Sequence, residues 1–143
     1  MDSSQYPALP VYALFATGLC LFVLILDSWS GVARAKTKTT LNKEDQKGEV
    51  AVVEEEREAV ARVNRVWRNA FANILPFLVI GFLYVLTGAS ARNATIYFGV
   101  FAGARLIHAV AYLNGKQPWR SLFFTVGQLA TLGLAVQVIR HFV

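Results

Sequence analysis

The sequence predicts an all-α protein, an integral-membrane four-helix bundle protomer. Of its 143 residues, 55% are hydrophobic, which is too apolar for an ordinary soluble domain. Four apolar stretches recur along the chain, each close to the roughly 20 residues that a helix needs to cross a bilayer. A chain of this length with four such stretches is expected to form a single domain, residues 1–143.

The first predicted helix covers about residues 10–29. Only Asp2 is charged ahead of it, and no small-x-small cleavage signal follows Trp29, so we expect a retained helix and not a signal peptide. Cys20 is the only cysteine and lies inside this helix. An intrachain disulfide and a cysteine metal cluster are therefore excluded, and no metal site is predicted.

The remaining helices are predicted at about residues 52–86, 93–113 and 119–138. Residues 33–50 are polar without apolar periodicity, which predicts a cytoplasmic loop. Valines recur from Val52 onward at helical spacing among Glu and Arg, so the second helix should extend out of the bilayer, and Pro76 should kink it. The short turns between the last three helices indicate antiparallel neighbours, as in an up-and-down bundle.

The distribution of basic residues predicts the orientation in the membrane. Residues 30–69 contain nine Lys and Arg, and the turn after the third helix adds Lys116 and Arg120, whereas the opposite side has only Arg92 and Arg140. Cytoplasmic loops retain positive charge, so both termini should be non-cytoplasmic. The basic residues alternate with glutamates beside the spans, so the net charge of +5 indicates this topology and no nucleic-acid partner.

Polar residues at membrane depth mark a candidate site. Arg105, His108 and Tyr112 are separated by three and four residues and therefore share one face of a helix. Arg68, Asn69 and Asn73 lie at the mouth of the preceding span. Ionisable groups are costly inside a bilayer, so a convergent polar face of this kind predicts a pocket between helices.

Three segments, VARVNRVWRNAFANILPF (60–77), FAGARLIHAVAYL (101–113) and PWRSLFFT (118–125), resemble one known family. They are similar to the MAPEG superfamily of membrane-associated proteins in eicosanoid and glutathione metabolism, in the branch of microsomal glutathione transferase 1 and microsomal prostaglandin E synthase 1. The resemblance is good from about residue 59 to residue 138 and weaker over residues 11–45.

The resemblance implies a homotrimer with glutathione sites between subunits, opening near the cytoplasmic face, in a bacterial inner membrane or the endoplasmic reticulum. It implies that Arg120 and Ser121 are catalytic and stabilise the thiolate. The residues that it implies for binding the tripeptide are Arg34, Arg68, Asn69, Arg105, His108 and Tyr112. The second substrate would be a lipophilic electrophile, giving a transferase, peroxidase or isomerase of detoxification or lipid metabolism. Arginines suit this ligand because they bind carboxylates bidentately, and nearby cations lower a thiol pKa.

The chain departs from the family pattern at the start of the second helix. Trp67, Ala70 and Ala72 stand where the family has a histidine and two acidic residues, so another low-molecular-weight thiol in place of glutathione stays open. The alternative hypothesis is a non-catalytic MAPEG-fold membrane protein that binds lipid or a protein partner. Structural roles also stay open, such as an ion pair of Arg105 with Asp27 or a headgroup anchor for Arg120.

Overall fold

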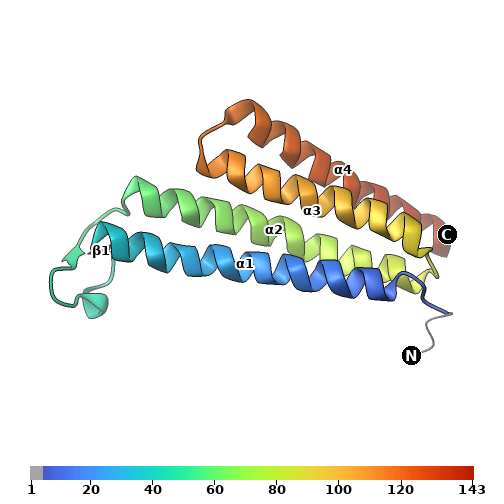
Figure 1. The fold of residues 1–143 in the computed structure, drawn as a ribbon, viewed down its shortest axis with the longest axis horizontal. Helices are drawn as coiled ribbons and strands as arrows, with labels where there is room; N and C mark the ends of the chain where they lie inside the picture. Colours follow the sequence, from blue (N-terminus) through green and yellow to red (C-terminus); the bar gives the residue numbers. More distant parts are fainter. Residues whose placement is uncertain (1–4) are drawn as a thin grey trace.

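The computed structural model describes residues 5–143 as four long helices in up-and-down order (Figure 1). These are α1 (Leu9–Thr37), α2 (Glu58–Leu86), α3 (Ala91–Leu113) and α4 (Gln117–Phe142). Each is long and apolar enough to cross a membrane. The protein is therefore a multi-pass membrane protein, and the predicted all-α four-helix architecture is confirmed.

Three of the helices end or begin several residues away from the predicted positions. α1 continues past residue 29 to Thr37 and stops where Lys38 adopts a left-handed backbone with φ 50°. Polarity indicated the end of the apolar span here, but it did not indicate the end of the helix, because a helix can continue into water. α2 begins at Glu58 and not near residue 52, while α4 extends beyond residue 138 to Phe142.

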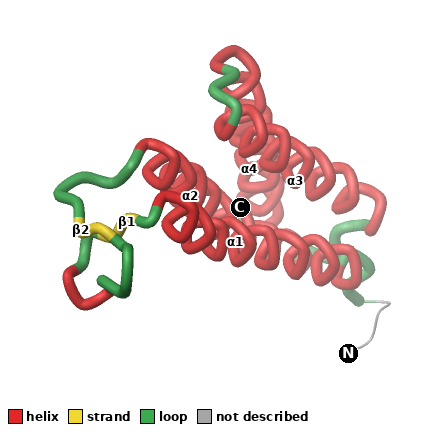
Figure 2. Tube along the Cα trace, turned by 60° about the vertical axis from the view of Figure 1, so that its left-hand side comes forward, coloured by secondary structure: helices red, strands yellow, loops and turns green. Residues whose placement is uncertain are grey.

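The segment between α1 and α2 is an ordered connection. Strands β1 (Thr39–Thr40) and β2 (Ala51–Val52) pair in parallel, with the short 3₁₀ helix η1 (Lys43–Asp45) between them (Figure 2). The Ala51 amide donates to the Lys38 carbonyl, and the Val53 amide donates to the Thr40 carbonyl, both at 2.9 Å. The residues predicted as a loop at 33–50 are thus helix, strand and 3₁₀ helix in part, and the chain is pinned to the end of α1.

The helices pack as two pairs that join in one core. α3 packs most extensively on α4 and α1 on α2 (Figure 2), with further contacts from α2 to α4 and from α1 to α3. Phe77 on α2 stacks on Phe101 on α3, with ring centroids 3.6 Å apart, and both are buried. Close approach of α4 to α3 depends on glycine, since a Cβ at Gly133 would lie 2.9 Å from Cε1 of Tyr97.

The up-and-down order places four helix ends together. The C-terminal ends of α1 and α3 and the N-terminal ends of α2 and α4 lie at the end of the bundle that carries β1, opposite the C-terminus of the chain (Figure 1). Residues that are far apart in sequence, at the ends of α1 and α3 and the starts of α2 and α4, therefore share one end of the molecule.

Candidate functional site

A pocket of about 290 Å³ opens among α2, α3 and α4 at this end of the bundle. It is lined by five of the eight residues that the sequence analysis selected, together with two further residues of α4: Asn69, His108, Tyr112, Arg120, Ser121, Phe124 and Thr125. The spacing on α3 and the Arg-Ser pair at the start of α4 thus converge on one space.

His108 joins α3 to the start of α4. Its Nδ1 lies 2.8 Å from the backbone carbonyl oxygen of Arg120. A carbonyl oxygen only accepts, so Nδ1 carries the proton and donates. The His108 ring also packs edge-on against Tyr112 and lies 5.9 Å from the ring of Phe124. This contact fixes the first turn of α4, and with it Arg120 and Ser121, against the polar face of α3.

Arg120 and Ser121 form a cationic, hydrogen-bonding corner of the pocket. Cζ of Arg120 lies 4.6 Å from the ring centroid of Tyr112, a cation–π contact that holds the guanidinium over α3. Ser121 follows directly in the first turns of α4, where the helix dipole favours an anion. A guanidinium, a hydroxyl and a helix start in one place can stabilise a thiolate.

Arg105 lies beneath the pocket and does not line it. The side chain is 1% exposed, its Nη2 donates to Oδ1 of Asn69, and its Cζ lies 5.8 Å from the ring centroid of Phe124. Within residues 5–143, Nε and Nη1 of Arg105 have no hydrogen-bond partner. The partner of Arg105 is thus the amide of Asn69 and not the carboxylate of Asp27.

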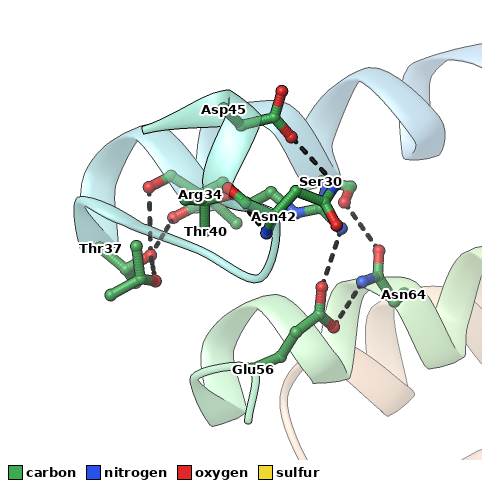
Figure 3. A network of polar contacts seen from close by, with 10 residues as sticks. Ser30, Arg34, Thr37, Thr40, Asn42, Asp45, Glu56 and Asn64 are labelled. Carbon is green, nitrogen blue, oxygen red and sulfur yellow. Dashed lines mark hydrogen bonds and ion pairs between the residues drawn. The ribbon is translucent and has the colours of Figure 1, made fainter. Parts of the chain in front are cut away.

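Arg34 and Arg68 stand outside this pocket, near a carboxylate that the sequence analysis did not select. Nη2 of Arg34 donates to Oε1 of Glu56 at 2.8 Å, and Nδ2 of Asn64 donates to Oε2 at 2.7 Å (Figure 3). Ser30 donates to Oδ1 of Asn64 at 2.7 Å, which fixes the orientation of that amide. Within a single protomer, the structure does not bring Arg34 and Arg68 together with Arg120.

The charge of Glu56 is stabilised in this position. Burial by itself raises the pKa of the Glu56 carboxyl, but hydrogen bonds from Arg34 and Asn64 and the nearby charges of Arg34 and Arg68 lower that pKa below its ordinary value. The sequence analysis missed Glu56 because it lies in an acidic run, residues 54–58, in which each glutamate has similar neighbours. The path of the chain from β2 to α2 distinguishes it, because this path brings Glu56 to Arg34 and Asn64.

The structure also shows where the three residues lie that replace the histidine and the two acidic residues of the family pattern. Ala70 is buried at 2% exposure, Ala72 is exposed on α2, and Trp67 stacks on Phe71 with centroids 5.9 Å apart. The residues that line the pocket include no carboxylate. The charge that the pocket offers to a ligand is therefore positive.

These features define a class of protein, a four-span membrane bundle with a cationic pocket at one end. The sequence profile of the MAPEG family matches residues 12–140. The chain is 38% identical over 138 residues to microsomal glutathione S-transferase 1 of Rattus norvegicus, covering 92% of this chain and 89% of that protein. It is 34% identical over 135 residues to prostaglandin E synthase of Canis lupus familiaris, covering 92% and 88%. The chain belongs to the MAPEG family, as the resemblance predicted.

Proposed function

We propose that the protein is a membrane-bound transferase that uses glutathione, or another low-molecular-weight thiol, to attack lipophilic electrophiles. The observation that carries the proposal is the convergence of Arg120, Ser121, Tyr112 and His108 on one pocket. The name of one relative, microsomal glutathione S-transferase 1, supports the same chemistry.

In the proposed mechanism, Arg120 balances the negative charge on the thiol sulfur, and Ser121 donates a hydrogen bond to it. Both interactions lower the thiol pKa and raise the thiolate fraction at neutral pH. The thiol loses its proton to solvent, and the thiolate sulfur donates an electron pair to an electrophilic carbon of the acceptor. As the carbon–sulfur bond forms, the bond from that carbon to the leaving group, or a π bond of the acceptor, breaks, and the displaced electron pair takes up a proton from solvent. Tyr112 holds the Arg120 guanidinium in place, and His108 holds the backbone of α4 against α3.

An apolar groove between α1 and α2 has a suitable lining for the lipophilic acceptor. Its volume is about 280 Å³, and it is lined by Cys20, Val23, Leu24, Phe71, Ile74, Leu75 and Leu78. These side chains belong to the apolar windows of α1 and α2, which an apolar substrate dissolved in the membrane would reach. Membrane lipid is the other occupant that this lining fits.

The proposal includes a homotrimer with sites between subunits. Arg34 and Arg68 lie on the α1–α2 side of the protomer, outside the pocket that contains Arg120. A neighbouring copy could supply these arginines to the pocket and complete the set that the family resemblance implies. The excess of Lys and Arg over residues 30–69 supports a cytoplasmic location for this end and non-cytoplasmic termini.

The first experiment is a titration of the purified protein with glutathione, followed by the ultraviolet absorbance of the thiolate. Wild type should give a saturable signal, and Arg120→Ala should lose both the signal and turnover while keeping its oligomeric state. Arg140→Ala removes an arginine from the opposite end of the bundle and should behave like wild type.

The outcomes separate the two hypotheses. An unchanged signal in Arg120→Ala would remove Arg120 from the mechanism. A saturable signal with a different thiol, and none with glutathione, would identify that thiol as the substrate. Absence of a signal with every thiol would favour the non-catalytic alternative, a MAPEG-fold protein that binds lipid or a partner.

A further inference from the structure

Glu56 is held as a fixed negative charge between two arginines. Arg34 reaches one carboxylate oxygen from α1, and Asn64 reaches the other from α2 (Figure 3). Arg68, one helical turn after Asn64, lies close enough to act on the same carboxylate by its charge. Ser30 holds Asn64 in turn, so residues of two helices determine where the Glu56 carboxylate points.

The cluster of Arg34, Glu56 and Arg68 is accessible and not fully neutralised. It contains two cations and one anion, and the side chains of Arg34 and Glu56 are 46% and 19% exposed. A guanidinium has five N–H donors, and the bond to Glu56 uses one of those on Arg34. The cluster therefore offers donors for a ligand carboxylate beside an acceptor for a ligand ammonium.

The thiol pocket itself offers no negative charge to an ammonium group. Its ionisable lining consists of Arg120, His108 and Tyr112, and Ala70 and Ala72 carry no charge at the positions where the family pattern is acidic. A ligand with a free α-amino group therefore needs its counter-charge from another part of the protein. Glu56 lies at the same end of the bundle.

We propose that Glu56, with Arg34 and Arg68, recognises the α-amino-acid end of the thiol substrate. The carboxylate of that end pairs with the arginines, and its ammonium pairs with Glu56. The substrate class is then thiols with a free α-amino-acid group, of which glutathione is one, and thiols without an amine are selected against. This inference rests on the proposed function and on the contact between neighbouring copies proposed with it.

The test compares glutathione with N-acetylglutathione, which keeps both carboxylates and the thiol but has no ammonium. Wild type should have a KM for glutathione at least tenfold below that for N-acetylglutathione. Glu56→Gln should reduce this preference to less than threefold by raising the KM for glutathione, with kcat little changed. Glu49→Gln is the matched control. Glu49 lies in the same α1–α2 connection and forms an ion pair with Lys38 at the end of α1.

Three results would contradict the role of Glu56 in amine recognition. A wild type without preference for the free amine would overturn the inference, and so would a preference that survives Glu56→Gln or that Glu49→Gln removes equally. If Glu56→Gln does not fold, Glu56→Asp is tested instead. Its shorter side chain moves the carboxylate away from the ligand, so the preference for glutathione over N-acetylglutathione should fall at least threefold. A wild type with no Arg120-dependent signal for either thiol would instead contradict the proposed function, and this inference with it.

Discussion

At the scale of single residues, Arg105 is the most demanding group in the structure. Its guanidinium is buried, and its one hydrogen-bond partner among residues 5–143 is the side-chain amide of Asn69 on another helix. A buried charge is costly when its hydrogen-bond partners are removed. The pair therefore couples α3 to α2 directly below the pocket and makes Asn69 structurally important as well as a lining residue.

Asn69→Ala should destabilise the protein by about 1.5–3 kcal/mol, the scale of a hydrogen bond to a charged group. Asn73→Ala is the matched control, because among the described residues the Asn73 side chain bonds only the Asn69 carbonyl of its own helix, at 2.7 Å. Thermal unfolding in detergent, followed by tryptophan fluorescence, measures both variants. Equal losses of stability in the two variants would show that the Arg105–Asn69 contact stabilises the protein no more than a hydrogen bond within one helix.

The residues of the pocket were predictable to the extent that local spacing determines them. The three-and-four spacing of Arg105, His108 and Tyr112 fixes a shared helix face whatever the rest of the chain does. The bond from His108 to the Arg120 carbonyl was not predictable, because a backbone acceptor on another helix leaves no mark in the sequence. Glu56 was missed for a related reason, since its partners come from two helices.

At the scale of elements, hydropathy predicted that there are four helices but not where they end. α1 leaves the apolar stretch and continues as a polar helix, so its end is set by the left-handed residue Lys38 and by the return of β2 along β1. Two-residue strands are too short to have a hydrophobic pattern. Their pairing depends on tertiary contacts, which the sequence pattern does not report.

The α3–α4 contact gives a prediction at this scale. Gly133→Ala would place a Cβ 2.9 Å from Cε1 of Tyr97, and this ring also packs edge-on against Tyr84. Because the Tyr97 ring must shift against Tyr84 to admit the methyl group, overpacking should cost about 1–3 kcal/mol despite the better helix propensity of alanine. The midpoint of thermal unfolding in detergent measures this cost.

Gly18→Ala provides the control for that substitution. Gly18 lies in α1 with nothing within 4 Å of the added Cβ, so the same chemical change meets no neighbour. Its unfolding midpoint should stay at the wild-type value or rise. A Gly133→Ala variant as stable as Gly18→Ala would show that α4 can move away from α3 at no cost.

At the scale of the whole molecule, the protomer leaves long apolar faces uncovered. Only 11% of the apolar window of α1 and 17% of that of α4 are buried within the protomer, so these helices face lipid or other copies of the chain. The candidate functional groups lie in two separate places on the protomer. Arg120 and Ser121 line the pocket, and Arg34 and Arg68 lie outside it. A site completed between neighbouring copies accounts for this division.

Mixed oligomers test that account. Arg34→Ala and Arg120→Ala should each be inactive at limiting thiol concentration, because each lacks one half of the proposed site. In a mixed trimer, one of the three interfaces combines an intact Arg34 from one copy with an intact Arg120 from the next. Random mixing by co-expression should therefore restore about a quarter of wild-type turnover, since about three quarters of closed trimers are mixed.

Mixing the two purified variants after assembly, without exchange of subunits, is the control and should restore nothing. A site contained within one protomer predicts no recovery in either case, because each polypeptide then carries a defect in its own site. Native mass spectrometry of the co-expressed sample measures the fraction of mixed trimers independently. Recovery in proportion to that fraction would assign Arg34 and Arg120 of one site to different copies of the chain.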